Sequence, residues 1–141
     1  MNKRLIVYIL GWVLIVEGAA MQIATVTSFI YGEHEGLYFL GVGALSALLG
    51  LLAVKVKKPK NPVLYQKAGF AAILMSFVGC FPFWLSGEIP SFIDAFYETV
   101  SGFTTTGSTI LTDVEALSHG MLMWRSFLHW LGGMGVIVFL L

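Results

Sequence analysis

Long apolar stretches and short polar connections alternate along the chain. The apolar stretches run from Leu5 to Ile30, Leu37 to Val54, Ala68 to Leu85 and Met121 to Leu141. Each contains roughly 18 residues or more, and a helix that rises about 1.5 Å per residue then comes close to crossing the hydrocarbon core of a membrane. The pattern therefore predicts a transmembrane helix in each stretch.

A shorter amphipathic pattern follows the third stretch. Pro90 and Ser91 can begin a helix. Apolar residues then recur with helical spacing over about three turns. These residues are Phe92, Ile93, Ala95, Phe96, Val100 and Phe103. Such a helix is about half the length of a membrane span, so we expect a half-helix that ends inside the membrane.

A hydroxyl-rich run with one glycine follows the half-helix. Non-helical backbone persists at membrane depth only where protein buries it or water reaches it. Backbone carbonyls can replace the hydration shell of potassium, and Gly107 permits a positive φ that turns carbonyls toward one side. We predict a selectivity filter whose ion-binding residues are Thr104, Thr105, Thr106, Gly107 and Ser108. Without its surroundings, the same run could instead be a threonine-rich turn that caps the next helix.

The composition agrees with a membrane protein. Of the 141 residues, 57% are hydrophobic and 11% are charged, whereas soluble domains carry about 25% charged residues. The formal net charge is zero, which gives no reason to expect a nucleic acid partner. The first apolar stretch is too long for the roughly 7 to 15 apolar residues of a cleaved signal, so we interpret it as a retained helix.

The charged residues separate into two groups that predict the orientation. Seven of the eight basic residues precede the first stretch or connect the second and third: Lys3, Arg4, Lys55, Lys57, Lys58, Lys60 and Lys67. Positive charge favours the cytoplasmic side, so we expect a cytoplasmic N-terminus. Seven of the eight acidic residues then fall on the outer side: Glu33, Glu35, Glu88, Asp94, Glu98, Asp113 and Glu115. This acidic face favours a cation pathway, although we expect Glu33 and Glu35 to be solvated loop residues.

Arg125 is the one basic residue that is not assigned to the cytoplasm. It lies near the outer end of the fourth stretch, within reach of Asp94, Glu98 or Asp113. We predict an ion pair that supports the filter, with Asp94, Glu98 and Arg125 as the supporting residues. The alternative is that Arg125 extends to the outer interface.

Glu17 lies near the middle of the first apolar stretch. Since an intramembrane carboxylate is costly, we expect it to make a structural hydrogen bond, and a functional role and a protonated side chain are the alternatives. Gly132, Gly133 and Gly135 in the fourth stretch predict close helix packing.

Two runs carry a resemblance to a known family. The first extends from Asp94 to Gly107, and the second combines Trp124-Arg125-Ser126 with the run from Trp130 to Gly135. Both resemble the Trk/Ktr/HKT potassium transporters, and the TrkH type among them. His129 departs from the pattern, because relatives commonly have Gln there.

The resemblance implies an all-α integral membrane protein, with two leading transmembrane helices and one helix–pore half-helix–filter–helix repeat. The leading helices and basic loop would occupy residues 1–60, and the first pore repeat residues 61–141. Within the repeat we expect a helix at about 64–86, the pore helix at about 90–103, the filter at about 104–109 and a second helix at about 121–141. The family builds one pore from four such repeats, so we expect this chain to be the N-terminal part of a longer transporter.

The resemblance also implies a setting. The partners would be membrane lipid, a second copy in a homodimer and a cytosolic nucleotide-binding regulatory subunit of the TrkA type. The location would be the bacterial inner membrane. Potassium would be the transported ligand, with no cofactor in this chain.

Other functions find less support in the sequence. His34, His119 and His129 show no metal-ligand spacing, and no nucleophile, base and orienting group occur together, so we do not expect an enzyme. Two alternatives stay open: a homotetrameric cation channel with one filter per chain, and a non-conducting membrane scaffold subunit.

Overall fold

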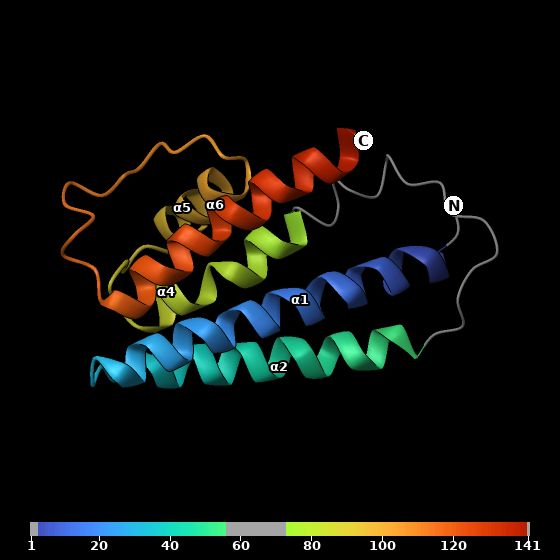
Figure 1. The fold of residues 1–141 in the computed structure, drawn as a ribbon, viewed down its shortest axis with the longest axis horizontal. Helices are drawn as coiled ribbons and strands as arrows, with labels where there is room; N and C mark the ends of the chain where they lie inside the picture. The colour runs from blue at the N-terminus through green and yellow to red at the C-terminus, as the bar shows by residue number, and fades with distance from the viewer. Residues whose placement is uncertain (1–2, 56–72, 141) are drawn as a thin grey trace.

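The computed structural model describes residues 3–55 and 73–140, and within these ranges the regular structure is helical, with no strand. Figure 1 shows an elongated bundle in which the turn between the first two helices and the start of the last helix lie at the same end. The predicted helix at 64–86 begins outside the described residues, and so do most of the lysines of the basic loop.

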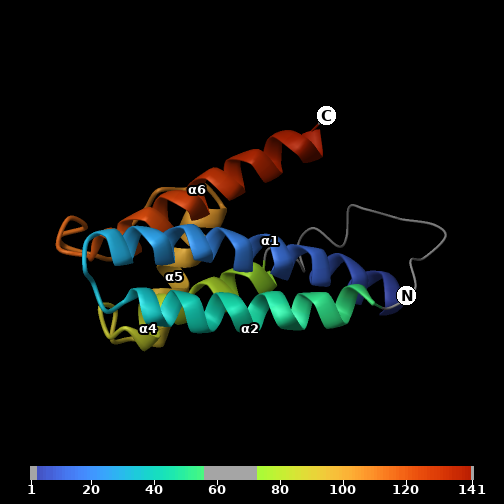
Figure 2. The same ribbon diagram turned by 60° about the horizontal axis from the view of Figure 1, so that its bottom comes forward.

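The leading helices form an antiparallel hairpin. Helix α1 runs over Lys3–Ile30 and α2 over Gly36–Val54, and they lie side by side in both views (Figures 1 and 2). Glycines allow the close approach: a Cβ at Gly18 would lie 2.7 Å from the Gly43 carbonyl oxygen. Two segments of the described chain, Leu10–Ile30 and Gly36–Val54, are long and apolar enough to cross a membrane.

The next described helix is interrupted. Residues 73–79 are helical, Cys80 forms a turn, and α4 continues over Phe81–Leu85. Pro82 near the start of α4 lacks an N–H, so the helix cannot continue its regular hydrogen bonding there. Gly87, with a φ of +80°, then turns the chain toward the amphipathic helix.

Helix α5 is the predicted half-helix and covers Phe92–Phe103. Ser91 caps its first turn, with the Asp94 N–H donating to Ser91 Oγ at 3.4 Å. With 12 residues, it is about 18 Å long, well short of a membrane span.

Helix α6, His119–Leu140, crosses the bundle beside α1 and α5 (Figure 2). Trp124 on α6 is fully buried with Phe39 of α2 and Phe83 of α4. The Trp124 ring N–H donates to the Gly79 carbonyl at 3.0 Å, which joins α6 to the helix that precedes α4. The core therefore unites the leading hairpin with the elements that hold the candidate site.

Candidate functional site

The chain leaves α5 through a tight turn at the predicted filter. The Thr104 N–H donates to the Val100 carbonyl at 2.8 Å, and the Thr106 N–H donates to the Ser101 carbonyl at 3.0 Å. Thr105 and Gly107 then have positive φ values of 55° and 72°. Left-handed backbone is costly for a threonine and free of strain for a glycine, so Gly107 occupies a position that favours its residue type.

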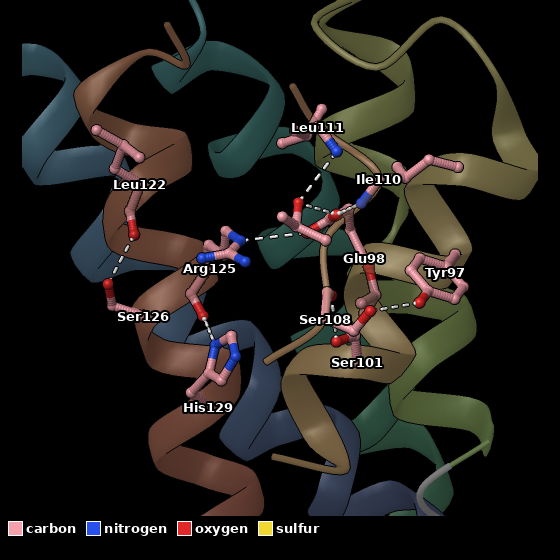
Figure 3. Close-up of polar contacts among 12 residues, drawn as sticks. Tyr97, Glu98, Ser101, Ser108, Ile110, Leu111, Leu122, Arg125, Ser126 and His129 are labelled. Atoms are coloured by element: carbon pink, nitrogen blue, oxygen red, sulfur yellow. Dashed lines mark hydrogen bonds and ion pairs between the residues drawn. The ribbon is translucent and has the colours of Figure 1, made fainter. Parts of the chain in front are cut away.

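After the turn, the chain runs back along α5 (Figure 3). The Ser101 hydroxyl donates to the Ser108 carbonyl at 2.5 Å, and Tyr97 Oη lies 2.8 Å from Ser108 Oγ. Both contacting side chains come from α5, so the half-helix holds the returning backbone at Ser108.

Glu98 holds the next part of the returning chain. Its side chain is 1% exposed, and its Oε1 accepts the Thr109 hydroxyl at 2.5 Å and the Ile110 N–H at 2.7 Å. Its Oε2 lies 3.2 Å from Arg125 Nε on α6 (Figure 3). One buried carboxylate therefore connects α5, the returning chain and α6. A charge this deeply buried is stable only with such a set of donors.

Asp94 lies outside this network. It occupies the first turn of α5, where negative charge interacts favourably with the helix dipole. The sequence left Asp94, Glu98 and Asp113 as possible partners of Arg125. In the structure, Arg125 pairs with Glu98.

The predicted filter itself is exposed on the surface of the described chain. Residues 104–110 are all exposed, and a Cβ at Gly107 would meet nothing within 4 Å. The Thr104 carbonyl accepts the Thr105 hydroxyl, and the Ser108 carbonyl accepts the Ser101 hydroxyl. In the described part of the chain, no group donates to the carbonyls of Thr105, Thr106 or Gly107. Three successive carbonyl oxygens of the predicted filter thus have no donor among the described residues.

Comparison with known proteins identifies the family. Residues 39–140 match the sequence profile of the TrkH cation transport proteins. The chain is 36% identical over 136 residues to an uncharacterised cation transporter of Methanocaldococcus jannaschii, which covers 94% of this chain and 29% of that protein. It is 32% identical over 145 residues to the potassium uptake protein TrkH of Escherichia coli, which covers 98% of this chain and 30% of that protein.

The chain belongs to the TrkH family of cation transport proteins. The crystal structure of the potassium transporter TrkH from Vibrio parahaemolyticus superposes with a TM-score of 0.84 at 28% identity, over 98% of this chain and 31% of that one. The predicted family and the predicted all-α membrane fold are both confirmed. The family consists of cation transporters, not enzymes. The chain spans about three tenths of the length of these relatives.

Glycines set the distance between α5 and α6, the two helices of the candidate site. A Cβ at Gly132 of α6 would lie 2.1 Å from the Phe103 carbonyl oxygen, and one at Gly102 of α5 would lie 2.8 Å from Leu128 Cβ. Gly132 therefore packs closely, as expected, and the residue that it packs against is Phe103, the last residue of the half-helix. Helix α6 can pass directly behind the point where the predicted filter begins.

The expectation for Glu33 was wrong, because this residue is not a solvated loop carboxylate. Its Oε1 accepts the His119 N–H at 2.8 Å and its Oε2 accepts the Gly120 N–H at 3.1 Å. His119 Nδ1 also lies 2.8 Å from Oε1. Glu88 accepts the Ser118 N–H at 3.1 Å. The carboxylates of Glu33 and Glu88 thus cap the start of α6. The spacing of these residues in the sequence did not reveal this contact.

The expectation for Glu17 was also wrong. Its side chain is fully buried, yet neither carboxylate oxygen has a hydrogen-bond partner in the described parts of the chain. The expected structural hydrogen bond is therefore absent there.

Proposed function

We propose that this chain contributes one filter segment to a potassium uptake pathway, as the N-terminal part of a four-repeat transporter. The observation that carries this proposal is the exposed run of free carbonyls at Thr105, Thr106 and Gly107, held at the C-terminal end of α5. The Escherichia coli relative is a potassium uptake protein and the Vibrio parahaemolyticus relative is a potassium transporter, which supports potassium as the transported ion.

Electrostatics at this position favour a cation. The C-terminal end of a helix carries partial negative charge, and α5 ends at Phe103, directly before the proposed filter. A dehydrating potassium ion needs several oxygens around it, and three carbonyls from one segment supply only part of a shell. Equivalent segments from the other repeats would complete it. The chemistry is limited to exchange of water oxygens for carbonyl oxygens.

The polar network provides the support that such a filter needs. Ser101 and Tyr97 hold Ser108, while Glu98 holds Thr109 and Ile110 and is itself paired with Arg125. These contacts anchor the chain at Ser108, Thr109 and Ile110, and they leave the carbonyls of Thr105, Thr106 and Gly107 without a donor. We therefore propose Glu98 and Arg125 as filter-supporting residues. Asp94, the third residue of that prediction, lies in the first turn of α5 and outside these contacts.

We infer the location and the orientation of the chain from its family and from the distribution of its basic residues. The chain would lie in a bacterial inner membrane, with the basic N-terminal residues and the basic loop in the cytoplasm. The whole transporter would form a homodimer and bind a cytosolic nucleotide-binding regulatory subunit of the TrkA type.

The test is Gly107→Ser in the intact transporter. A side chain at a φ of 72° costs about 1–2 kcal/mol, and relief of that strain would move the neighbouring carbonyls. Since 1.4 kcal/mol corresponds to about tenfold, we expect the preference for potassium over sodium to fall by roughly tenfold. Ion fluxes in reconstituted vesicles would measure it.

The matched control is Gly87→Ser. Gly87 also has a positive φ, of 80°, and open space around it, but it lies before α5. Its substitution carries the same backbone strain and should leave the preference unchanged. If both variants keep the parent's preference, the proposed filter is wrong. If the intact parent carries no flux at all, the chain belongs to a non-conducting subunit.

A further inference from the structure

Glu17 presents a problem that the proposed transport function does not explain. It lies in the membrane-spanning part of α1, 0% exposed, with both carboxylate oxygens unpartnered. Because these oxygens are already enclosed, no group from elsewhere in the transporter can reach them unless a neighbouring side chain moves. Glu17 must therefore be stable with the surroundings that the described chain provides.

Those surroundings contain no positive charge to balance a carboxylate. From α6, Arg125 is already paired with Glu98 of α5. Helix α2 has no charged residue between Gly36 and Val54. The titratable group that interacts with Glu17 from the segment before α4 is the Cys80 thiol, which donates to the Phe77 carbonyl at 3.1 Å. An ionised Glu17 would thus be an isolated buried charge, which proteins avoid by binding a proton.

The position of Glu17 is a junction between the hairpin and the pore repeat. A Cβ at Gly79 would lie 2.9 Å from Glu17 Oε1 and 3.0 Å from Thr99 Cγ2 of α5. The Gly79 carbonyl accepts the Trp124 ring N–H of α6. Glu17 of α1 therefore packs against the point where three elements of the repeat meet.

We propose that Glu17 is a proton-binding site, occupied when the leading hairpin is packed against the pore repeat. Loss of the proton would place an uncompensated charge at the junction. The packed state therefore binds the proton, and a state in which water reaches Glu17 releases it. Proton occupancy at Glu17 is thus coupled to the contact between α1 and the repeat.

Infrared spectroscopy on the intact transporter in lipid vesicles tests the site directly, without any need for ion flux. A protonated carboxylic acid has a carbonyl stretch that a carboxylate lacks. We expect this band at neutral pH in the parent and its loss in Glu17→Gln, which keeps the shape and removes the acid. The control Glu115→Gln removes an exposed carboxylate and should leave the band unchanged.

A second variant keeps the test decisive if Glu17→Gln does not fold. Cys80→Ala retains the acid and removes a neighbouring thiol, so it should shift the same band. Thermal unfolding adds an independent readout. The packed state holds the proton, whereas the unfolded state releases it above the ordinary pKa of a glutamate, about 4.3. Stability of the parent should therefore fall as the pH rises above that value, and less so in Glu17→Gln. Absence of the band from the parent, or a band that neither variant alters, would overturn the proposal.

Discussion

At the scale of single residues, the buried carboxylates of this chain have opposite environments. Glu98 is 1% exposed and accepts hydrogen bonds from Thr109, Ile110 and Arg125. Glu17 is as deeply buried and has no partner among the described residues. The first arrangement stabilises a charge and the second disfavours one. We propose that Glu98 supports the filter as a charged carboxylate. Glu17, in our proposal, is a neutral acid where the leading hairpin packs against the pore repeat.

The Glu98–Arg125 pair gives a prediction at this scale. Arg125→Gln leaves the Glu98 charge buried with fewer donors, so we expect it to destabilise the protein by about 3–5 kcal/mol and reduce potassium uptake. Glu98→Gln should be similarly harmful. The double variant should be less harmful than the sum of the two, by about 1–3 kcal/mol, because neither charge is then left alone.

Unfolding in detergent with a double-mutant cycle would measure this coupling. Asp94→Asn is the matched control, since Asp94 lies on the same helix but outside the network. Strictly additive effects of the two single variants would show that the pair does not act as a unit.

At the scale of elements, the position of α6 behind α5 depends on individual glycines. Gly132 and Gly133 are adjacent, but only Gly132 faces the Phe103 carbonyl closely. A Cβ would lie 2.1 Å from that oxygen at Gly132 and no closer than 3.8 Å from any neighbour at Gly133. The backbone of α5 cannot give way as a flexible side chain would, so the two helices would have to separate.

Gly132→Ala is therefore expected to destabilise the protein and Gly133→Ala is not. Overpacking of this kind costs about 1–3 kcal/mol. Separation of α6 from Phe103 would also move Thr104 and Thr105, so ion preference should change together with the melting temperature. Gly133→Ala removes a helical glycine without a clash and should be neutral or slightly stabilising. Equal melting temperatures for the two variants would contradict this account of the packing.

At the scale of the whole molecule, the outer end joins the leading hairpin to the pore repeat. Glu33, between α1 and α2, contacts His119 and Gly120 at the start of α6, and the Tyr31 and His119 rings stack at 3.9 Å. Burial alone would raise the pKa of Glu33. Hydrogen bonds from His119 and Gly120, with the charge of His119, instead hold the pKa below its ordinary 4.5.

The lowered pKa of Glu33 predicts acid sensitivity of this junction. A carboxylate whose folded pKa is depressed adds stability above its ordinary pKa, and that contribution disappears as the pH falls through the folded value. We expect the melting temperature of the parent to drop as the pH falls below about 4.5, and Glu33→Gln to show a smaller drop. Glu35→Gln, two residues away, is the control. A parent and Glu33→Gln with parallel pH profiles would refute the linkage.

Much of the local structure could be predicted from the sequence because its causes are local. The apolar stretches predicted the leading helices, and Ser91 with its following apolar spacing predicted the half-helix. Gly107 was predicted to permit a positive φ, and it has one. The specific partners were harder to predict. Arg125 had three candidate acids, and Glu33 had no visible reason to contact His119, 86 positions away.

The sequence by itself determined a helical membrane protein with a glycine-containing, non-helical segment after a half-helix, since hydrophobic length, capping and φ preferences act over a few neighbouring residues. Only the tertiary structure decided that Arg125 pairs with Glu98, that Glu33 caps α6 and that Glu17 has no partner. These facts depend on how helices distant in the sequence pack in three dimensions. A shift of a few ångströms between helices changes which side chain lies within hydrogen-bond distance, and no local pattern encodes it.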